Sequence, residues 1–350
     1  MASNWKILAA LVSLSAIAVA ACNSSSNSGN TAGQGGKTVE LLNVSYDPTR
    51  ELWKAINEKF IESYQKTAGV TVAIEQSHGG SSSQARVVME GLPADVVTLA
   101  MWGDTDAIRK AGLINQGWEE RLPNGSLPYS STIVFVVRKG NPKQIKDWPD
   151  LVGEGVEVIT PHPKTSGNGK LSFLSAWGSV VLRDGSEKDA LEFVTKLYKA
   201  VPVLDSGARG STTTFAQRGI GDVHLTWENE AHLEVDEAKG ELEIVFPKIS
   251  IRAEPRVAVV DANVDKKGTR DVAEAYLKYL YTDEAQEIIA EKFYRPYKAS
   301  VLRAHEKSFP QMELFSIKQI ADGGWGEADK RFFADGAVFD NIYVPDGGEK

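Results

Sequence analysis

The sequence predicts an α/β protein of two lobes, each a mainly parallel sheet flanked by helices. Short apolar runs that suit strands alternate with longer runs whose apolar residues recur at helical spacing, which is the pattern of repeated βα units. Such units form parallel sheets that are covered on both faces. The chain has 350 residues, of which 42% are hydrophobic and 25% are charged. This composition is that of a globular protein, and the length exceeds what one core usually holds.

The N-terminus carries the pattern of a secretion signal. Lys6 precedes an apolar stretch, Ile7–Ala21, which is too short to span a bilayer and fits the core of a signal peptide. The sequence VAAC, which ends at Cys22, resembles the lipobox of bacterial lipoproteins, where the signal is cut before a cysteine that is then lipidated. We therefore expect residues 1–21 to be a signal peptide and residues 22–37 to be a lipidated cysteine with a flexible tether. Cys22 is the single cysteine of the chain, so no intramolecular disulfide can form.

The first lobe is predicted to be discontinuous, from residues 38–130 and 252–300. Its N-terminal part contains apolar runs that we expect to be strands, namely Thr38–Ser45, Val70–Ile74 and Ala94–Ala100. Asp47 and Pro48 are expected to be the N-cap and first residue of the helix after the first strand. Further helices are predicted at Ser83–Met89, Asp104–Ala111, Val272–Tyr281 and Glu284–Phe293.

Residues 131–251 are predicted to form the second lobe. A long apolar strand, Ser130–Arg138, is expected to cross into it from the first lobe, and Val257–Val260 is expected to cross back. The other strands predicted here are Val156–Thr160, Val201–Leu204, Val223–Thr226 and Leu242–Phe246. Helical spacing of apolar residues marks Leu171–Val181 and Ala190–Tyr198. The C-terminal segment 301–350 is rich in aromatic residues and is expected to pack on the lobes.

Short turns of small residues lie between a predicted strand and a helix start at His78–Ser81, Ser166–Asn168 and Asp205–Ser211, and a further strand ends at Trp227. At a helix start several backbone N–H groups have no intrahelical acceptor, and the helix dipole favours negative charge there. Because the carboxyl ends of parallel strands meet at one edge of a sheet, we expect these turns to face one ligand.

The formal net charge of −8 restricts the possible partners. A chain this acidic, without a basic run, is not expected to bind nucleic acid or a membrane surface, and an anion must be held by a local site. The candidate donors are hydroxyl, backbone N–H and indole N–H groups without formal charge, from Ser81, Ser166, Gly167, Asn168, Ala208 and Trp227. Such a set suits a fully ionised oxyanion such as sulfate. It rejects a protonated phosphate, whose O–H group finds no acceptor.

Catalytic and metal-binding alternatives have little support. The five histidines show no zinc-ligand spacing and there is no Gly-x-Ser-x-Gly motif, so we expect no metal and no cofactor. Glu228 and Glu230 could act as an acid–base pair, but an exposed helix start is the expected role. His78 is expected to hydrogen-bond within its turn, and Arg209 to hold its turn by bonding carbonyl groups. Asp47 is either a simple N-cap or a residue that orients the donors.

Several stretches resemble the periplasmic sulfate-binding proteins, which are the substrate-capture subunits of ABC importers. The resemblance covers about residue 38 to the end of the chain, so the signal and tether lie outside it. It is carried by LLNVSYDPTREL (41–52), QSHGGS (76–81), ADVVTLA (94–100), STIVFVVRKGNPKQI (131–145), VITPHPKTSG (158–167), VLDSGARGST (203–212), RGIGDV (218–223), WENEA (227–231), AEAYLKYLY (273–281) and YRP (294–296).

The resemblance implies the two-lobed periplasmic-binding-protein fold of type II, with the ligand in the interlobe cleft and a hinge that closes on it. It implies direct sulfate contacts from the six candidate donor residues, with Asp47 and Arg209 bracing the binding loops. Family members often read S-G-G where this chain has Ser166, Gly167 and Asn168. Asn keeps the backbone N–H but tolerates a positive φ less easily than Gly, so affinity or ligand preference can differ. The lipobox is a second departure, because free secreted forms are common in the family.

Together these observations predict a sulfate receptor, not an enzyme, that delivers sulfate to an ABC importer. Its expected partners are sulfate, the membrane subunits of the importer and a lipid anchor at Cys22. We expect a monomer in the cell envelope, in the periplasm or on the outer face of the cytoplasmic membrane. Thiosulfate is the first alternative ligand, followed by molybdate or chromate. Two other classes stay open, an anion-activating enzyme or transferase and a ligand-sensing partner of a receptor.

Overall fold

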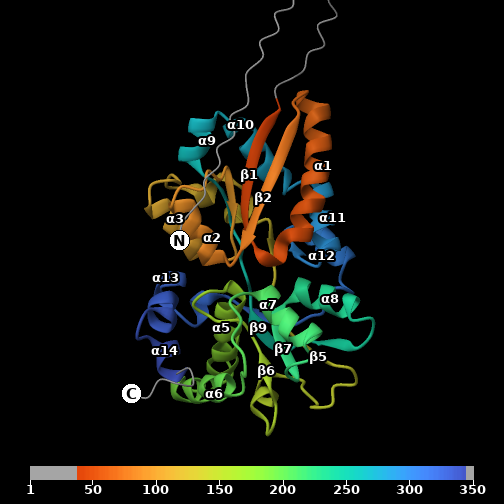
Figure 1. The fold of residues 1–350 in the computed structure, drawn as a ribbon, viewed down its shortest axis with the longest axis vertical. Helices are drawn as coiled ribbons and strands as arrows, with labels where there is room; N and C mark the ends of the chain where they lie inside the picture. Colours follow the sequence, from red (N-terminus) through yellow and green to blue (C-terminus); the bar gives the residue numbers. More distant parts are fainter. Residues whose placement is uncertain (1–37, 344–350) are drawn as a thin grey trace, which may run out of the picture. The chain divides into compact units, whose positions relative to one another are not determined.

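The structure is a computed structural model and describes residues 38–343, which lie in one compact unit (Figure 1). The predicted signal peptide 1–21, the cysteine Cys22 and the tether 22–37 lie outside the described residues. The larger sheets within residues 38–343 are both four-stranded, with strand orders β10-β3-β1-β2 and β6-β7-β5-β8. We call the elements on the first of these sheets the first lobe and those on the second sheet the second lobe.

The sheet of the first lobe is mainly parallel, as the βα pattern predicts. Its strands are β1 (Val39–Tyr46), β2 (Val72–Gly79), β3 (Val96–Thr98) and β10 (Val257–Val259). β1 runs parallel to both β2 and β3, and β10 pairs antiparallel with β3. The carboxyl ends of β1 and β2 therefore meet at one edge, where Tyr46 stands opposite Gly79.

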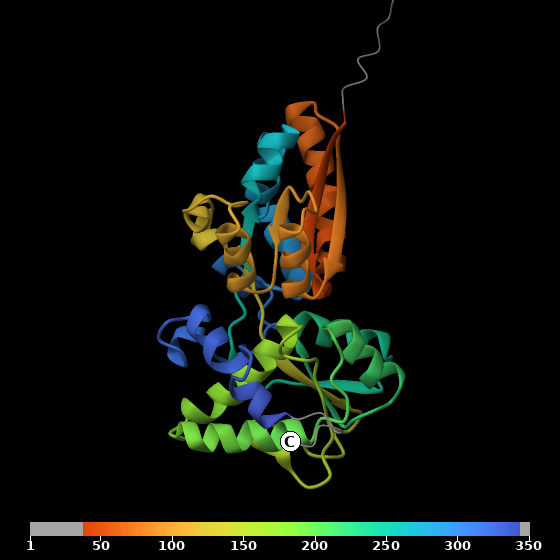
Figure 2. The same cartoon turned by 60° about the vertical axis from the view of Figure 1, so that its left-hand side comes forward.

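Helices α1 (Arg50–Ala68), α2 (Ser81–Met89) and α10 (Arg270–Tyr279) cover this sheet and bury apolar residues against it. The apolar face of α1 consists of Leu52, Trp53, Ile56 and Phe60, and α1 lies alongside β2 in Figures 1 and 2. Asp47 is not the N-cap that the sequence predicts, since a short 3-10 turn begins there and α1 starts only at Arg50. The helical elements of this lobe are η1 (Asp47–Thr49), α1 (Arg50–Ala68), α2 (Ser81–Met89), α3 (Trp102–Lys110), η2 (Trp118–Arg121), α4 (Pro123–Ser126), α9 (Asp261–Lys267), α10 (Arg270–Tyr279), α11 (Asp283–Glu291) and α12 (Ala299–Ala304).

The sheet of the second lobe is mixed, and the prediction of a mainly parallel sheet is wrong here. Its strands are β5 (Ile133–Arg138), β6 (Val158–Ile159), β7 (Val223–Trp227) and β8 (Leu242–Val245). β5 runs antiparallel to both β7 and β8, and only β6 and β7 pair in parallel. The error has a physical cause, because β5 and β7 are buried along their length and a strand covered on both faces is continuously apolar in either orientation.

Val201–Leu204 is not the strand that its apolar character predicts. Pro202 lies within this run and has no N–H group to donate to a neighbouring strand. The segment forms an irregular connection into α7 instead. The helical elements of this lobe are η3 (Trp148–Val152), α5 (Gly167–Val181), α6 (Glu187–Lys199), α7 (Ala208–Thr212), the π-helical turn η4 (Thr213–Gln217) and α8 (Glu228–Glu237).

The segments that connect the lobes lie side by side. The predicted strand Ser130–Arg138 is divided into β4 (Tyr129–Ser130) and β5, and Ser131 between them forms an isolated bridge to Ala253. β4 pairs with β11 (Arg295–Pro296), and β9 (Ile249–Ile251) pairs with β12 (Glu313–Phe315).

Residues 313–343 of the C-terminal segment pack on the second lobe, whereas Val301 and Phe309 pack against Ala290 of the first lobe. Phe332 and Phe333 contact the ring of Phe173 in α5, and Lys170 of α5 donates to Asp329 at 2.7 Å. The helical elements of this segment are η5 (Ile317–Gln319), α13 (Trp325–Ala328), the π-helical turn η6 (Asp329–Phe333) and α14 (Val338–Ile342). Among the helices of residues 38–343, none is both long and apolar enough to cross a bilayer.

Candidate anion-binding site

The predicted turns of both lobes meet around one small cavity. The first lobe contributes the ends of β1 and β2, and the second lobe contributes the starts of α5 and α7 and the end of β7. The lining residues are Tyr46, Asp47, Pro48, Gly79, Gly80, Ser81, Ala100, Ser166, Gly167, Asn168, Gly207, Ala208 and Trp227. Its free volume is about 10 Å³, far below the hundreds of Å³ of a pocket for an organic ligand. The structure therefore brings all of the candidate donors to a space for one small group.

Helix starts supply the donors from both lobes. α2 begins at Ser81, α5 at Gly167 and α7 at Ala208, and each start faces the cavity. The backbone N–H groups in a first helical turn have no intrahelical acceptor, so they are free to donate to a ligand. Ser166 is the N-cap of α5, and its Oγ accepts from the Gly169 N–H at 3.5 Å, which leaves the hydroxyl hydrogen for another acceptor.

Trp227 closes one wall of the cavity at the end of β7. Its ring is buried and lies 5.3 Å from the ring of Tyr46, between centroids. Within residues 38–343 no acceptor takes a hydrogen bond from its indole N–H. This group, which can only donate, is therefore available to a ligand in the cavity.

The Ser81 side chain is held by a buried carboxylate that the sequence analysis missed. Its Oγ donates to Asp104 Oδ2 at 2.5 Å and accepts the Ala100 N–H at 3.1 Å, while Ser82 Oγ donates to the other Asp104 oxygen. Burial raises the pKa of Asp104, against the opposing effects of Lys170 and the two serines. Because the Ser81 hydroxyl hydrogen points to Asp104, the backbone N–H of Ser81 is the donor that remains for a ligand. The sequence signal that could have indicated this role is the position of Asp104 shortly after the third strand of a parallel sheet.

Comparison with known proteins identifies the family. Residues 41–295 match the family described as bacterial extracellular solute-binding protein. A sulfate-binding protein of Escherichia coli strain K12 is 54% identical over 308 residues, which cover 87% of this chain and 93% of that protein. A thiosulfate-binding protein of Pseudomonas aeruginosa is 51% identical over 307 residues, 87% of this chain and 92% of that protein. The chain belongs to the bacterial extracellular solute-binding proteins.

The solved structures agree with this family. The structure of a sulfate-binding protein from Mycobacterium tuberculosis is 31% identical, with a TM-score of 0.77, and the match covers 84% of this chain and 99% of that chain. The predicted two-lobed α/β fold of the periplasmic binding proteins is thereby confirmed. As a member of this family the chain is a binding protein and not an enzyme, and its class acts outside the cytoplasm.

Asn168 has the backbone of an ordinary helical residue in this solute-binding protein. It is the second residue of α5, and it is not among the residues with positive φ. The predicted conformational penalty for Asn in place of Gly is therefore wrong. Its side-chain amide donates to the Leu225 carbonyl at 2.9 Å, whereas its Oδ1 is buried without a partner in the described chain. The bond to Leu225 ties the start of α5 to β7, the strand that carries Trp227.

Arg209 pairs with carboxylates and does not bond carbonyl groups as predicted. Its Nη2 donates to Glu51 of the first lobe at 2.8 Å and to Glu230 of the second lobe at 3.1 Å. Arg209 does not line the cavity, whereas Asp47 does and accepts a hydrogen bond from Arg50 at 2.7 Å. The structure thus places one of the two predicted bracing residues at the cavity wall and the other behind it.

Glu228 and Glu230 are buried, and the prediction of an exposed helix start is wrong for both. Glu228 is 0% exposed and accepts two hydrogen bonds of 2.7 Å from Arg295. Burial raises the pKa of Glu228 against the effect of Arg295, and it raises the pKa of Glu230 to about 8 against that of Arg209. A buried carboxylate needs such a cationic partner, and each partner here comes from a distant part of the chain.

His78 does not form the predicted hydrogen bond within its turn. Its Nε2 is buried without a partner in the described residues, and burial lowers the pKa of His78 to about 4. It does not line the cavity either. Within the described part of the chain there is no cluster of side chains that could hold a metal ion.

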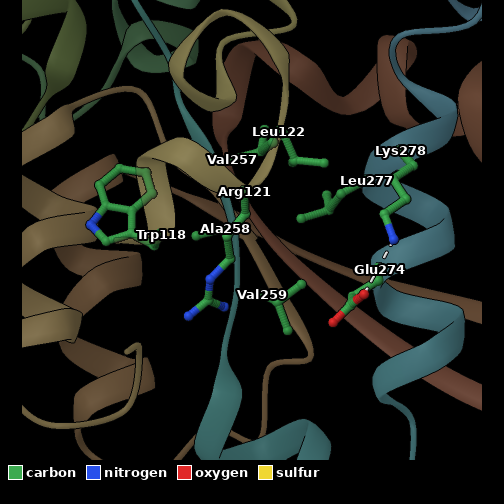
Figure 3. A pocket seen from close by; sticks show the side chains of 9 residues that line it. All are labelled: Trp118, Arg121, Leu122, Val257, Ala258, Val259, Glu274, Leu277 and Lys278. Carbon is green, nitrogen blue, oxygen red and sulfur yellow. Dashed lines mark hydrogen bonds and ion pairs between the residues drawn. The ribbon is translucent and has the colours of Figure 1, made fainter. Parts of the chain in front are cut away.

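A larger cavity on the first lobe has a different character (Figure 3). It has a volume of about 250 Å³ and lies between η2, β10 and α10. Its walls are largely aliphatic, and its charged groups are already paired, Lys278 with Glu274 at 3.3 Å and Arg121 with Asp261 at 2.9 Å. The small cavity differs from it, because the donors that line the small cavity lack partners in the described residues.

Proposed function

We propose that this protein binds sulfate and delivers it to an ABC importer. The observation that carries the proposal is a space for one small group that is lined by uncharged donors, with Asp47 as the only charged residue of the lining. A dianion in such a site is held by charge-assisted hydrogen bonds, each contributing roughly 1.5–3 kcal/mol. The names of the full-length relatives, sulfate-binding and thiosulfate-binding protein, support the same ligand class.

The proposed contacts follow from the groups that face the cavity without a partner. The backbone N–H groups of Ser81, Gly167, Asn168 and Ala208 donate to the sulfate oxygens, together with the Ser166 hydroxyl and the Trp227 indole. Asp47 and Arg209 brace the loops that present these donors. A protonated phosphate is disfavoured where its O–H hydrogen faces these donors, and Asp47, the one carboxylate of the cavity lining, already accepts a hydrogen bond from Arg50.

Thiosulfate is the second candidate, because a thiosulfate-binding relative is 51% identical to this chain over nearly its full length. Thiosulfate carries a sulfur in place of one oxygen, so it offers a weaker acceptor and needs more room at one position. The two ligands share the same donors, and competition between them decides the assignment.

The lobes of the proposed receptor are residues 38–130 with 252–300 and residues 131–251, and the described part of segment 301–350, residues 301–343, packs on them. The ligand enters an open cleft, and a hinge at the connecting segments closes the lobes on it. The pairing of Arg209 with Glu51 across the lobes supports this motion, since it requires the closed arrangement.

At the N-terminus we propose a signal peptide, residues 1–21, and lipidation of Cys22. The tether 22–37 would then hold a monomeric receptor close to a membrane, in the periplasm or on the outer face of the cytoplasmic membrane. Radiolabelled palmitate in growing cells tests the anchor. The intact chain is expected to take up label and to sediment with membranes, and Cys22→Ser is expected to do neither.

Calorimetric titration tests the ligand. The protein is purified without sulfate and titrated with sulfate, thiosulfate, molybdate and phosphate. Tight one-to-one binding of sulfate without binding of phosphate is the expected result. Tight thiosulfate binding beside weak sulfate binding would move the assignment to the second candidate, and absence of binding to all four anions would remove the proposed function.

A further inference from the structure

We propose that Gly80, Gly167 and Gly207 form a contact seam between the lobes that sets the size of the anion the closed cleft accepts. The inference rests on the proposed oxyanion-binding function. It assigns the anion selectivity of that site to three positions where the close approach of the opposite lobe leaves little room for a side chain. Two of the three, Gly80 and Gly207, are not among the proposed donors.

The first observation is that each of these glycines faces the opposite lobe at close range. A Cβ atom on Gly80 would lie 2.7 Å from the carbonyl oxygen of Thr165, and one on Gly167 would lie 3.0 Å from the Cβ of Ala100. A Cβ on Gly207 would lie 3.4 Å from Asp47 Oδ2, which is an ordinary contact. The room for a Cβ atom therefore differs along the seam: at Gly80 it would clash with backbone, and at Gly207 it would make an ordinary van der Waals contact.

The second observation is that none of the three needs glycine for its backbone conformation. Gly80 has φ −60° and ψ 134°, and Gly207 has φ −157° and ψ 169°, which any residue adopts. Gly167 is the first residue of α5 and is not among the residues with positive φ. Gly69 and Gly268 show the contrast, because they end helices at positive φ, and a Cβ atom on either would have no atom within 4 Å.

The third observation is that each seam glycine directly precedes a proposed donor. Gly80 precedes Ser81, Gly167 precedes Asn168 and Gly207 precedes Ala208, so the distance between the lobes at the seam fixes the distance between donors across the cavity. Hydrogen bonds weaken within a few tenths of an ångström beyond their usual length. A seam without side chains brings the donors close enough for a small tetrahedral anion, and a wider seam favours a larger one.

Gly80 is the position where a methyl group cannot be absorbed locally. The atom that it would meet belongs to the backbone of Thr165, whose turn is held by hydrogen bonds from Thr165 N to the His162 carbonyl and from Thr165 Oγ1 to the Ser206 carbonyl. The clash lies between lobes, so it is relieved when they separate. Gly80→Ala is therefore expected to oppose closure of the lobes without changing the fold of either lobe.

The test measures sulfate and thiosulfate affinity of the full chain and its variants by titration, with release rates from stopped-flow tryptophan fluorescence. Gly80→Ala is expected to lower sulfate affinity roughly 10- to 100-fold, the usual range for overpacking a tight contact, chiefly through faster release. Thiosulfate affinity should fall less, so that the sulfate-to-thiosulfate ratio drops by about threefold or more. Gly207→Ala should lower sulfate affinity less than Gly80→Ala does. Gly207→Val should lower it more than Gly207→Ala, and the extended backbone at this position suits a β-branched residue.

Gly326→Ala is the matched control, because Gly326 lies in α13 with nothing within 4 Å and without a positive φ. It should bind both anions as the unmodified chain does. All variants should show the unmodified melting temperature without ligand. An unchanged affinity ratio in both Gly80→Ala and Gly207→Val, in a protein that binds sulfate, would overturn the seam alone. An unmodified protein that binds neither anion would overturn the proposed function, and the seam with it.

Discussion

The anion cavity differs from the two buried glutamates that follow Trp227 in the chain, Glu228 and Glu230, in whether the polar groups already have partners. In the cavity, uncharged donors without partners face one small space. Directly after Trp227 in the chain, Glu228 and Glu230 are buried and already paired with Arg295 and Arg209. The charge of Glu228 is thus balanced by Arg295 before a ligand arrives, Glu230 keeps its proton up to about pH 8, and a bound anion meets oriented dipoles.

This difference has a physical reason. A buried ion needs a partner in place, because its desolvation is costly, whereas an N–H group at a helix start can donate to water until a ligand takes its place. Removing the cationic partner of a buried glutamate should therefore lower the free energy of unfolding strongly. Removing a donor in the cavity should chiefly weaken binding and should lower stability by less. Variants of the glutamate partners and of the cavity donors test this difference.

Arg295→Met should lower the free energy of unfolding by about 3–5 kcal/mol, because it leaves the Glu228 carboxylate buried without a partner. The loss should shrink at pH 5, where the stranded carboxyl can take up a proton. Urea unfolding measures it, with Lys66→Met as control, since Lys66 forms an exposed pair with Glu62 and such pairs contribute little to stability. Equal losses in the two variants would contradict the contrast.

Trp227→Phe and Ser166→Ala should each weaken sulfate binding by about 1–3 kcal/mol, because each removes one donor from a desolvated anion. Calorimetry measures the affinity and urea unfolding the stability, which should fall by less than in Arg295→Met, by about 1 kcal/mol for the N-cap lost in Ser166→Ala. If both variants bound sulfate as the unmodified protein does, the small cavity between the lobes would not be the sulfate site.

Glu51→Gln should weaken sulfate binding by about 1 kcal/mol or less, because Glu51 and Arg209 are both partly exposed where they pair across the lobes. The effect should fade at high salt, since exposed pairs are screened. Glu62→Gln is the matched control, as Glu62 pairs with Lys66 within α1. A loss that is independent of salt would point to a role other than the ion pair.

Changes in pH should act on stability and hardly at all on binding. The pKa of Glu230 is raised from the usual 4.5 to about 8, so the folded chain holds this proton more tightly than the unfolded chain. Its contribution to stability is therefore fully present below about pH 4.5 and is lost as the pH rises through about 8. The unfolding free energy of the unmodified protein, relative to Glu230→Gln, should fall between pH 5 and pH 8.5.

Sulfate affinity, by contrast, should change less than about twofold between pH 6 and pH 8, because the cavity lining contains no Lys, Arg or His and the ligand stays fully ionised. Titrations of the unmodified protein at both pH values test this. A steep dependence that persists in Glu230→Gln would place a titrating group inside the cavity.

Much of the site could be predicted from local sequence. A small-residue turn between a strand and a helix start is a local pattern, and its exposed N–H groups follow from helix geometry alone. Local patterns of this kind are enough to indicate Ser81, Ser166, Gly167, Asn168, Ala208 and Trp227, and these residues do lie around one cavity. The strands of the first lobe could also be predicted from the sequence, because βα units show a regular alternation of short apolar runs and helical spacing.

Most of the elements, the donors and the family resemblance could be predicted from residues close together in the chain, whereas the predicted strand Val201–Leu204 is not formed. Three features became visible in the fold alone: β5 runs antiparallel to β7, Glu228 and Glu230 are buried, and Gly80 lies against the backbone of Thr165. Each of these depends on a partner from another part of the chain, such as Arg295 for Glu228. Burial, pairing and close approach are properties of two surfaces in contact, and the pattern of one segment does not contain the other surface.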